Sequence, residues 1–231
     1  LFANGLYTVG DLASVSLETL FTLLSVDIDV CLSSLSQLQE VSKLSFKDDL
    51  REIFEGDTLS DKEKEVLSKR NGFNSKPLTL DETGQYFNVT RERCRQIESK
   101  STAKVMAKSS KIRNQILMLF IALTTPAERR YISTDIVSSY MGDELLAKYY
   151  LFIIENGNFD LKFDSKLNIV YNSTLVSLDE LSDEVINVYG PYIFQNDYDS
   201  LNKFEKSVID TKYKEYYDGF YLLRGYQTKE L

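Results

Sequence analysis

The sequence contains no histidine and no tryptophan, and it has only two cysteines and three prolines among 231 residues. Without histidine there is no Ser-His-Asp triad, no Cys-His dyad and no histidine-ligated zinc or haem. Cys31 and Cys94 lie far apart and form no CxxC motif, which favours a reduced, intracellular protein with free thiols. These absences favour a binding protein over an enzyme, and we expect no cofactor and no metal site.

Long hydrophobic runs are missing as well. The most apolar stretch, residues 116–123, is too short to cross a bilayer, so we expect no membrane partner. The chain opens with Leu1 and has no basic segment before an apolar core. We interpret it as a processed or excised piece.

Charge is distributed unevenly along the chain, although the formal net charge is −8. Residues 61–114 contain 13 basic and 7 acidic side chains, whereas residues 1–60 contain 3 and 10, and residues 115–231 contain 11 and 18. The basic segment between two acidic ones has a charge density suited to a phosphate backbone. The alternative interpretation is a solvated helix face.

Two capping boxes predict helices in this basic segment. Residues 60–63 form the first box, which opens a helix to about residue 70, and residues 79–82 form the second, which opens a helix to about residue 87. A third helix begins near Thr90 after a short turn. Helix, tight turn and helix at this spacing predict a DNA-binding helix-turn-helix.

The third helix has two different sides on a helical wheel. The side expected to pack on the preceding helix carries Cys94, Ile97 and Ser101. The opposite side carries Glu92, Gln96 and Lys100. Glutamine pairs with adenine, glutamate with the cytosine amino group, and arginine with guanine. The basic residues placed to meet phosphates are Arg93, Arg95, Lys104 and Lys108.

Residues 59–72 and 79–100 closely resemble region 4 of bacterial sigma factors, the helix-turn-helix that reads the promoter −35 element. The string V-T-R-E-R-x-R-Q-I-E-x-K stands in register with an upstream T-L-x-E-x-G and a leading L-x-x-x-E-x-x-V-L-x-x-R-x-G. The resemblance extends over about residues 59–114. It implies double-stranded DNA and RNA polymerase core as partners, a role in transcription regulation or initiation, and a bacterial, cytoplasmic, nucleoid-associated location.

The resemblance also implies roles for individual residues. Base contacts are expected from Arg91, Glu92, Arg95 and Gln96. Backbone contacts are expected from Thr90, Arg93 and Lys100, to which the charge pattern adds Lys104. Cys94 stands where sigma factors usually have isoleucine. The sequence has no counterpart of the tryptophan-bearing sigma region 2.

A weaker resemblance covers residues 1–25. The phrase from Gly5 to Leu12 is similar to the opening of helix-hairpin-helix modules, including the C-terminal domain of the alpha chain of bacterial RNA polymerase. The stretch that would form the second, phosphate-binding hairpin, residues 25–29, is acidic and has no glycine. A structural or partner-binding role is therefore expected there.

The acidic C-terminal part has a different pattern. Residues 133–140 and 143–155 read as helices, and residues 159–163 and 167–171 read as two short strands. Helix, helix and hairpin is the order of a winged helix. Its second helix is acidic, so contact with another protein is favoured over DNA. A closing strand or hairpin over residues 219–226 suggests a repeat of this unit.

The expected fold class is therefore mainly α and multi-helical, with a helix-turn-helix centre and a C-terminal α+β winged-helix-like part. The expected domains are a small helical domain at 1–56, the helix-turn-helix domain at 57–125 and an acidic, aromatic-rich domain at 126–231. The expected function is sequence-specific binding of double-stranded DNA without enzymatic activity.

Two alternatives stay open. The chain could be the DNA-targeting or polymerase-contacting part of a larger DNA-processing protein. It could also be a metal-dependent nuclease that uses Glu155 with residues 160–162 or 164–166, two D-x-K triplets on the predicted hairpin. A simple hairpin turn explains the same triplets.

Overall fold

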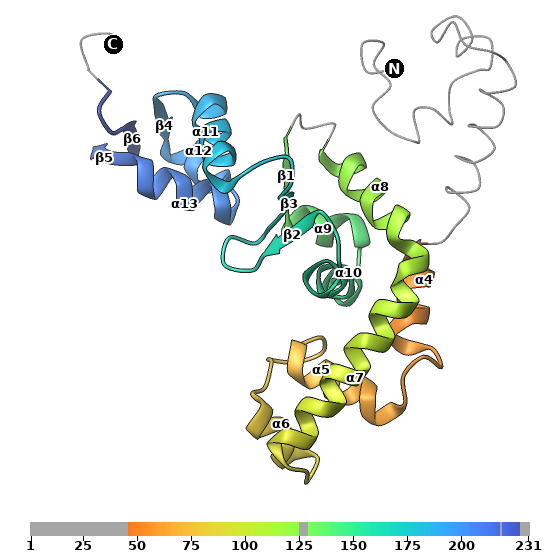
Figure 1. Cartoon of the computed structure of the whole chain (residues 1–231). Coiled ribbons are helices and arrows are strands. Elements are labelled where there is room, and N and C mark those ends of the chain that lie inside the picture. The colour runs from red at the N-terminus through yellow and green to blue at the C-terminus, as the bar shows by residue number, and fades with distance from the viewer. Residues whose placement is uncertain (1–45, 125–128, 218, 227–231) are drawn as a thin grey trace, which may run out of the picture. The chain divides into compact units, whose positions relative to one another are not determined.

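The computed structural model describes residues 46–124, 129–217 and 219–226 (Figure 1). The chain is mainly α with small antiparallel sheets in its C-terminal part, which confirms the predicted fold class. The predicted helical hairpin at residues 1–25 lies outside the described residues. Within the described ranges, no helix is both long and apolar enough to span a bilayer.

The helices are α4 (Phe46–Glu55), α5 (Asp61–Asn71), α6 (Leu80–Tyr86), α7 (Arg91–Ser109), the 3-10 helix η2 (Ser110–Ile112), α8 (Arg113–Thr124), α9 (Thr134–Met141), α10 (Glu144–Asn156), α11 (Leu178–Tyr189), α12 (Gln195–Ser200) and α13 (Lys203–Lys212). The strands are β1 (Tyr131–Ser133), β2 (Leu161–Asp164), β3 (Ile169–Asn172), β4 (Tyr192–Phe194), β5 (Tyr213–Tyr217) and β6 (Phe220–Leu223).

The described residues fall into two compact units. The first contains the described residues up to Arg129 together with Met141–Asn158, and the second contains Arg130–Tyr140 and the described residues from Phe159 onward. The helix-turn-helix, α4 and α10 therefore belong to the first unit. The predicted division of the chain after residues 56 and 125 stays a prediction.

In the first unit, both predicted capping boxes are present. The Ser60 hydroxyl accepts the amide of Glu63 while the Glu63 carboxylate accepts the amide of Ser60, and Thr79 and Glu82 do the same for α6. Each box satisfies amide groups that have no partner inside the helix. Gly72 ends α5 with a φ of 66°, and a Cβ there would come within 2.9 Å of the Ser75 carbonyl oxygen, which explains the glycine.

An interlocked group of aromatic rings holds α10 against α4 and α5. Phe54 stacks on Tyr149 with ring centroids 4.0 Å apart, and Phe73 meets the same tyrosine edge-on at 5.0 Å. Phe152 packs edge-on against both phenylalanines. The Lys148 ammonium also donates hydrogen bonds to the carbonyl oxygens of Gly72 and Phe73, so α10 is tied to the segment that follows α5.

The C-terminal elements repeat one order twice. Helix, strand, helix, helix and hairpin occur first as α8, β1, α9, α10, β2 and β3, and again as α11, β4, α12, α13, β5 and β6. The sheets have equivalent strand orders, β1-β3-β2 and β4-β6-β5, with every pair antiparallel. This is the order of a winged helix, and it confirms the predicted helix, helix and hairpin and the suggested repeat.

The second unit has its own core. Side chains from β1, β3, α11, β4, α13 and β5 form one buried cluster, with Leu181, Ile209 and Ile169 fully buried. The last hairpin differs from the prediction because it consists of β5 and β6 and begins at Tyr213, not at residue 219. Gly219, with a φ of 76°, lies in its turn and not at its start.

Candidate nucleic-acid interface

A small apolar core joins the helices of the helix-turn-helix. Val66 of α5 packs with Cys94 and Ile97 of α7, and the partly buried side chains around them are Leu80, Phe87 and Val89. Cys94, Ile97 and Ser101 are all buried, which confirms the side of α7 predicted to pack. Burial raises the pKa of the Cys94 thiol, so this cysteine is neutral and acts as a small hydrophobic residue.

The turn between α6 and α7 is set by two residues. Asn88 adopts a left-handed conformation with a φ of 52°, which asparagine tolerates better than most residues. The Val89 amide donates to the Gly84 carbonyl oxygen at 2.9 Å. A Cβ on Gly84 would lie 2.8 Å from the Val89 carbonyl oxygen, so the glycine of T-L-x-E-x-G permits this close approach.

Two ion pairs fasten α7 to α5. The Arg70 guanidinium donates to the Glu98 carboxylate at 3.0 Å, and both side chains are mostly buried. Arg70 also donates to the Leu78 carbonyl oxygen. Further along α7, the Lys104 ammonium lies 2.7 and 2.9 Å from the two carboxylate oxygens of Glu63.

The Glu63 carboxylate is held in its ionised form. Hydrogen bonds from Lys104 and from the Ser60 amide lower the pKa of Glu63 from 4.5 to about 2. The Glu63 side chain is 11% exposed, so solvent screens this pair little. The glutamate of the leading motif thus has two structural tasks, since it caps α5 and fixes the position of α7.

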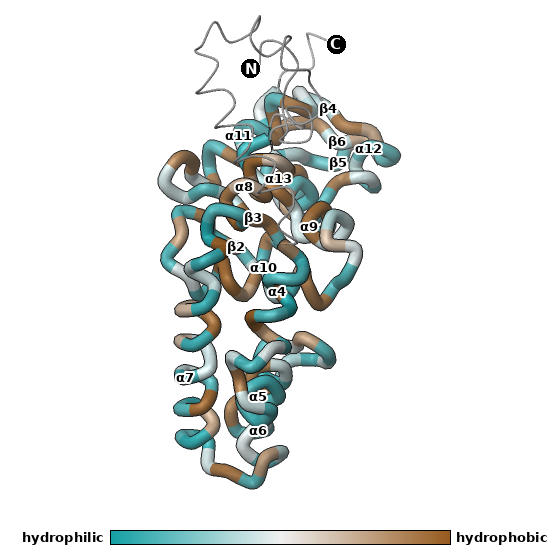
Figure 2. Tube along the Cα trace, turned by 90° about the vertical axis from the view of Figure 1, so that its right-hand side faces the viewer, coloured by the Kyte–Doolittle hydropathy of each residue, from teal (hydrophilic) through white to brown (hydrophobic). Residues whose placement is uncertain are grey.

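The four residues predicted to read bases lie together on the exposed side of the first two turns of α7. They are Arg91, Glu92, Arg95 and Gln96. Figure 2 shows hydrophobic segments recurring along α7 among hydrophilic ones, as expected for a helix with one packed side.

Hydrogen bonds connect these exposed side chains to one another. The Glu92 carboxylate accepts hydrogen bonds from Nε and Nη2 of Arg95 at 2.9 and 2.8 Å, and from the Gln96 amide at 3.3 Å. The hydrogen bonds from Arg95 lower the pKa of Glu92 to about 2. Arg91 forms a looser pair with Asp81, 3.4 Å away, in which both side chains are largely exposed.

The residues predicted to contact phosphates have two kinds of surroundings. Thr90 is the N-cap of α7, and its hydroxyl accepts the Arg93 amide at 3.2 Å. Arg93 and Lys100 are exposed, and Arg93 donates to the Gln96 side chain at 3.3 Å. Lys104, by contrast, is held by Glu63, and Lys108 lies 3.4 Å from Glu52.

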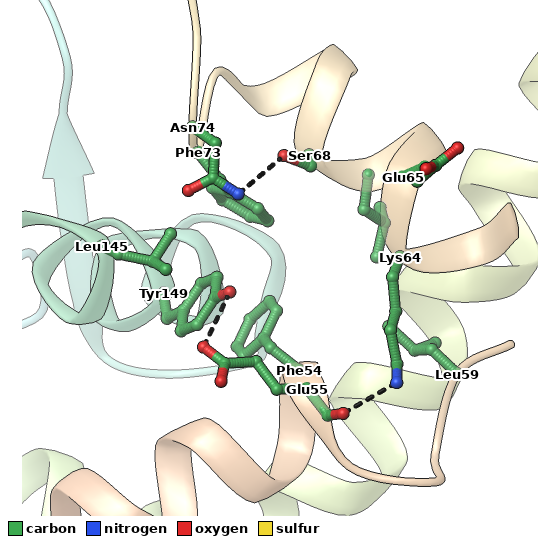
Figure 3. Close-up of a pocket in the computed structure, with 11 residues that line it drawn as sticks. Phe54, Glu55, Leu59, Lys64, Glu65, Ser68, Phe73, Asn74, Leu145 and Tyr149 are labelled. Carbon is green, nitrogen blue, oxygen red and sulfur yellow. Dashed lines mark hydrogen bonds between the residues drawn. The ribbon is translucent and has the colours of Figure 1, made fainter. Parts of the chain in front are cut away.

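The first unit also contains an apolar pocket of about 390 Å³ between α4, α5 and α10 (Figure 3). Phe54 and Tyr149 lie side by side in it, with the Tyr149 hydroxyl 3.3 Å from the Glu55 carboxylate. None of the predicted DNA-contacting residues lines this pocket. The pocket is therefore separate from the exposed side of α7.

The D-x-K triplets lie at the β2–β3 hairpin. The Asp164 carboxylate accepts the backbone amides of Lys166 and Leu167 at 2.9 and 3.0 Å, so it forms the turn. In the ranges that the structure describes, no group of three or more acidic or cysteine side chains is arranged to hold a metal ion. The turn accounts for Asp164 without any catalytic role.

A packed α6, a tight turn and an α7 with exposed arginine, glutamate and glutamine side chains define a helix-turn-helix of the sigma-factor type. Residues 57–106 match the family described as Sigma-70, region 4. The match confirms the resemblance drawn from the sequence motifs.

Similar proteins are RNA polymerase sigma factors named SigA. The SigA of Microcystis aeruginosa is 46% identical over 83 residues, which make up 36% of this chain and 19% of the relative. The SigA of Synechocystis sp. is also 46% identical over 83 residues, 36% of this chain and 18% of the relative, and that of Nostoc sp. is 42% identical over 83 residues, 36% of this chain and 20% of the relative. The chain thus spans about one fifth of the length of these relatives.

Proposed function

We propose that this protein binds double-stranded DNA sequence-specifically by placing the N-terminal turns of α7 in the major groove. The observation that carries the proposal is the division of α7 into two sides. Cys94 and Ile97 are buried against α5 and α6, while Arg91, Glu92, Arg95 and Gln96 stand exposed on the first two turns. A major groove admits an α-helix presented in this way.

Base readout would replace the hydrogen bonds that these side chains make with one another. In the free protein, Glu92 occupies the donor groups of Arg95 and Gln96. On DNA, arginine offers two donors to guanine, glutamine pairs with adenine, and glutamate accepts from cytosine. Such an exchange leaves no polar group without a partner. The base edges offer these side chains acceptors and donors in place of those that the side chains offer one another in the free protein.

Phosphate contacts are proposed for Thr90, Arg93 and Lys100, which lie at or near the exposed side of the same helix. The position of Thr90 at the start of α7 also supports a phosphate contact, because helix N-termini attract anions. Lys104 has a competing partner in Glu63, and we propose that its main task is to hold α7 on α5.

We further propose a role in transcription regulation or initiation, with RNA polymerase core as a protein partner. The support is the match to sigma region 4 and the fact that the similar proteins are named RNA polymerase sigma factors. Association is tested by co-purification of the full chain with core polymerase. Absence of the complex under conditions that retain a sigma factor would contradict this part of the proposal.

A second proposal is that the chain serves as the DNA-targeting or polymerase-contacting part of a larger assembly and performs no chemistry itself. The similarity to the relatives covers 36% of the chain, and two winged-helix-like repeats follow the helix-turn-helix. If this is so, DNA incubated with the protein and Mg²⁺ or Mn²⁺ stays intact. Cleavage that disappears in Asp160→Ala or Lys162→Ala would overturn it.

The experiment that tests the main proposal is selection of the full chain against a randomised duplex library at two salt concentrations, with sequencing of the retained DNA. A specific reader enriches one motif at both salt concentrations, and the −35 hexamer TTGACA is the first to look for. Gln96→Ala serves as the matched variant, because its exposed side chain is not needed for packing. Strongly salt-dependent retention without any motif would contradict base readout.

A further inference from the structure

The two winged-helix-like repeats differ in whether the outer face of the sheet is covered. In an antiparallel sheet, residues directly opposite each other project to the same face. The register therefore places Tyr131 and Tyr171 on one face of the first sheet, and Tyr192 and Leu222 at the equivalent positions of the second sheet. The two sheets can be compared position by position.

The face of the first sheet that carries Tyr131 is covered by α11 and α13 of the second repeat. Tyr131, Ile169 and Tyr171 belong to the same buried cluster as Leu181 of α11 and Phe204 of α13. The Tyr131 and Phe204 rings meet edge-on with centroids 5.0 Å apart. These contacts make the second repeat a partner for the first.

Polar contacts fix the position of this pair of helices on the first sheet. The Tyr131 hydroxyl donates to the Glu205 carboxylate of α13 at 2.9 Å in a buried position. At the edge, the Arg130 guanidinium lies 2.8 Å from the Glu184 carboxylate of α11. The partner of the first sheet is thus an apolar two-helix surface that brings carboxylates to a tyrosine and a basic residue.

The equivalent face of the second sheet is much less covered by the described residues: Leu222 in its central strand is 6% exposed, but the aromatic residues beside it stay accessible. Tyr131 is 3% exposed but Tyr192 is 41% exposed, and Ser133 is 4% exposed but its equivalent Phe194 is 56% exposed. Phe220, which pairs with Phe194, is partly exposed and occupies the position of the fully buried Ile169.

The exposed residues of the second sheet form one aromatic surface. The rings of Tyr192, Phe194 and Phe220 are in mutual contact, with centroids 5.6 to 6.2 Å apart. Lys214 lies opposite Leu222, so the register places it on the same face, where the first sheet has Lys162 opposite Tyr171. Clustered exposed aromatic residues are characteristic of protein interfaces.

We propose that this aromatic surface, formed by Tyr192, Phe194 and Phe220, is a docking surface for a pair of amphipathic helices from another protein. They would pack on β4-β6-β5 as α11 and α13 pack on β1-β3-β2 (Figure 1). The helices present an apolar side with a carboxylate that accepts the Tyr192 hydroxyl and meets Lys214. A second copy of this chain does not supply such a surface from α11 and α13, because its own first sheet already covers them.

A nucleic acid is a poor occupant for this surface. Residues 115–231 carry 18 acidic and 11 basic side chains, and a phosphate backbone is repelled by such an excess. A pair of helices, by contrast, can place its few carboxylates next to Lys214. The acidic excess of this part of the chain then repels the partner little at the contact itself. The aromatic surface is therefore better suited to a protein than to a nucleic acid. The helices of the partner would cover the second sheet as α11 and α13 cover the first.

The test is photo-crosslinking of the full-length protein in its own host cells, with p-benzoyl-phenylalanine replacing Phe194. The matched control carries the same group at Leu175, which is 73% exposed and does not belong to the aromatic surface. The expected result is an adduct, specific to position 194, that maps to an apolar position on a helix of another protein. Adducts only with a second copy of the chain, only with nucleic acid, or no more abundant than at position 175 would overturn the proposal.

The partner identified by crosslinking is then purified, and its affinity for variants of this chain is measured. These affinities decide whether the contact is built as inferred. Phe194→Ser introduces the residue of the first repeat and is expected to weaken binding by about tenfold or more, because exposed aromatic residues dominate such interfaces. Tyr192→Phe removes only the hydroxyl and is expected to cost about threefold to tenfold. Leu175→Ser is expected to leave affinity unchanged, and DNA binding should be the same in all three variants. Equal affinity of Phe194→Ser and the unmodified protein would overturn the proposal.

Discussion

The Glu92 carboxylate accepts two hydrogen bonds from the Arg95 guanidinium, at 2.8 and 2.9 Å, on the exposed side of α7. This bidentate pair brings an acidic side chain to the surface proposed to enter the major groove. The negative charge of Glu92 is repelled by the DNA phosphates. A cytosine amino group that donates a hydrogen bond to the carboxylate would offset this repulsion. If α7 enters the groove as proposed, Glu92 is expected to disfavour the wrong sequence as well as to favour the right one.

Glu92→Ala is expected to relax specificity at one base pair and to strengthen binding to unrelated DNA. The reason is that the variant removes a negative charge and frees the Arg95 guanidinium. Affinities for the selected site, for the site changed at single positions and for a scrambled duplex measure both effects. Glu65→Ala removes an exposed carboxylate from α5 and serves as control. If both variants strengthen binding to all duplexes equally, Glu92 contributes only net charge.

Base-reading and phosphate-contacting residues should respond differently to substitution. Arg91→Ala or Gln96→Ala is expected to cost about 1–3 kcal/mol on the selected site and to relax one base pair each. Lys100→Ala is expected to weaken binding to every sequence alike and to lower the slope of log affinity against log salt by about 1. Titrations at several salt concentrations on matched and mismatched duplexes separate the two patterns. An identical loss on all DNA for the three variants contradicts base readout.

The Glu63–Lys104 pair is expected to stabilise the helix-turn-helix in a pH-dependent way. The folded-state pKa of Glu63 is about 2 against an ordinary 4.5, so its contribution is complete above about pH 5 and is lost as the pH falls from 4.5 towards 2. From this difference in pKa, Glu63→Gln is expected to lower the free energy of unfolding by at most about 3 kcal/mol at pH 7. The difference from the unmodified protein should shrink in acid.

Denaturant unfolding of the two proteins at a series of pH values measures this difference. Glu65→Gln, a substitution of an exposed glutamate on the same helix, controls for the loss of a carboxylate. Lys104→Met should destabilise the protein at neutral pH, because it leaves the Glu63 charge without its main partner. A Lys104→Met protein of unchanged stability but reduced salt slope would show instead that Lys104 serves the DNA backbone.

Gly84→Ala is expected to destabilise the helix-turn-helix by roughly 1–3 kcal/mol. The added Cβ would lie 2.8 Å from the Val89 carbonyl oxygen, and backbone atoms at this distance must move apart. Thermal unfolding measures the loss, and weaker DNA binding should accompany it because α7 begins at the end of this turn. At Gly142, which has a φ of 64°, an added Cβ would meet no atom of the surrounding structure within 4 Å, so Gly142→Ala adds backbone strain without a contact, whereas Gly84→Ala adds the contact.

The helix-turn-helix could be predicted from the sequence because its signals are local. The capping boxes at Ser60 and Thr79 fixed two helix starts, and the spacing of Cys94, Ile97 and Ser101 identified the buried side of α7. Such patterns depend on residues within a turn or two of one another. The sequence motifs also indicated the resemblance to sigma region 4, which the family match over residues 57–106 confirms.

Long-range pairs could not be predicted in the same way. Glu63 and Lys104 are 41 residues apart, and both have ordinary reasons to occur on a helix surface. Strands β1 and β4 have three residues each, which is too short for an alternating pattern to stand out. Tyr149 and Phe152 could be recognised as apolar, but not as the residues that hold α10 on Phe54.

The central claim is that α7 reads base edges in the major groove, and guanine N7 methylation tests it most directly. The N7 atom faces the major groove, where arginine binds it, and lies away from the phosphates. On the selected duplex, methylation of the contacted guanines is expected to abolish binding of the unmodified protein. Arg91→Ala is expected to become insensitive to N7 methylation at one guanine of the site. Arg95→Ala is expected to become insensitive to N7 methylation at another guanine. Binding that tolerates N7 methylation at every guanine of the site, or variants with the same sensitivity as the unmodified protein, would contradict the account.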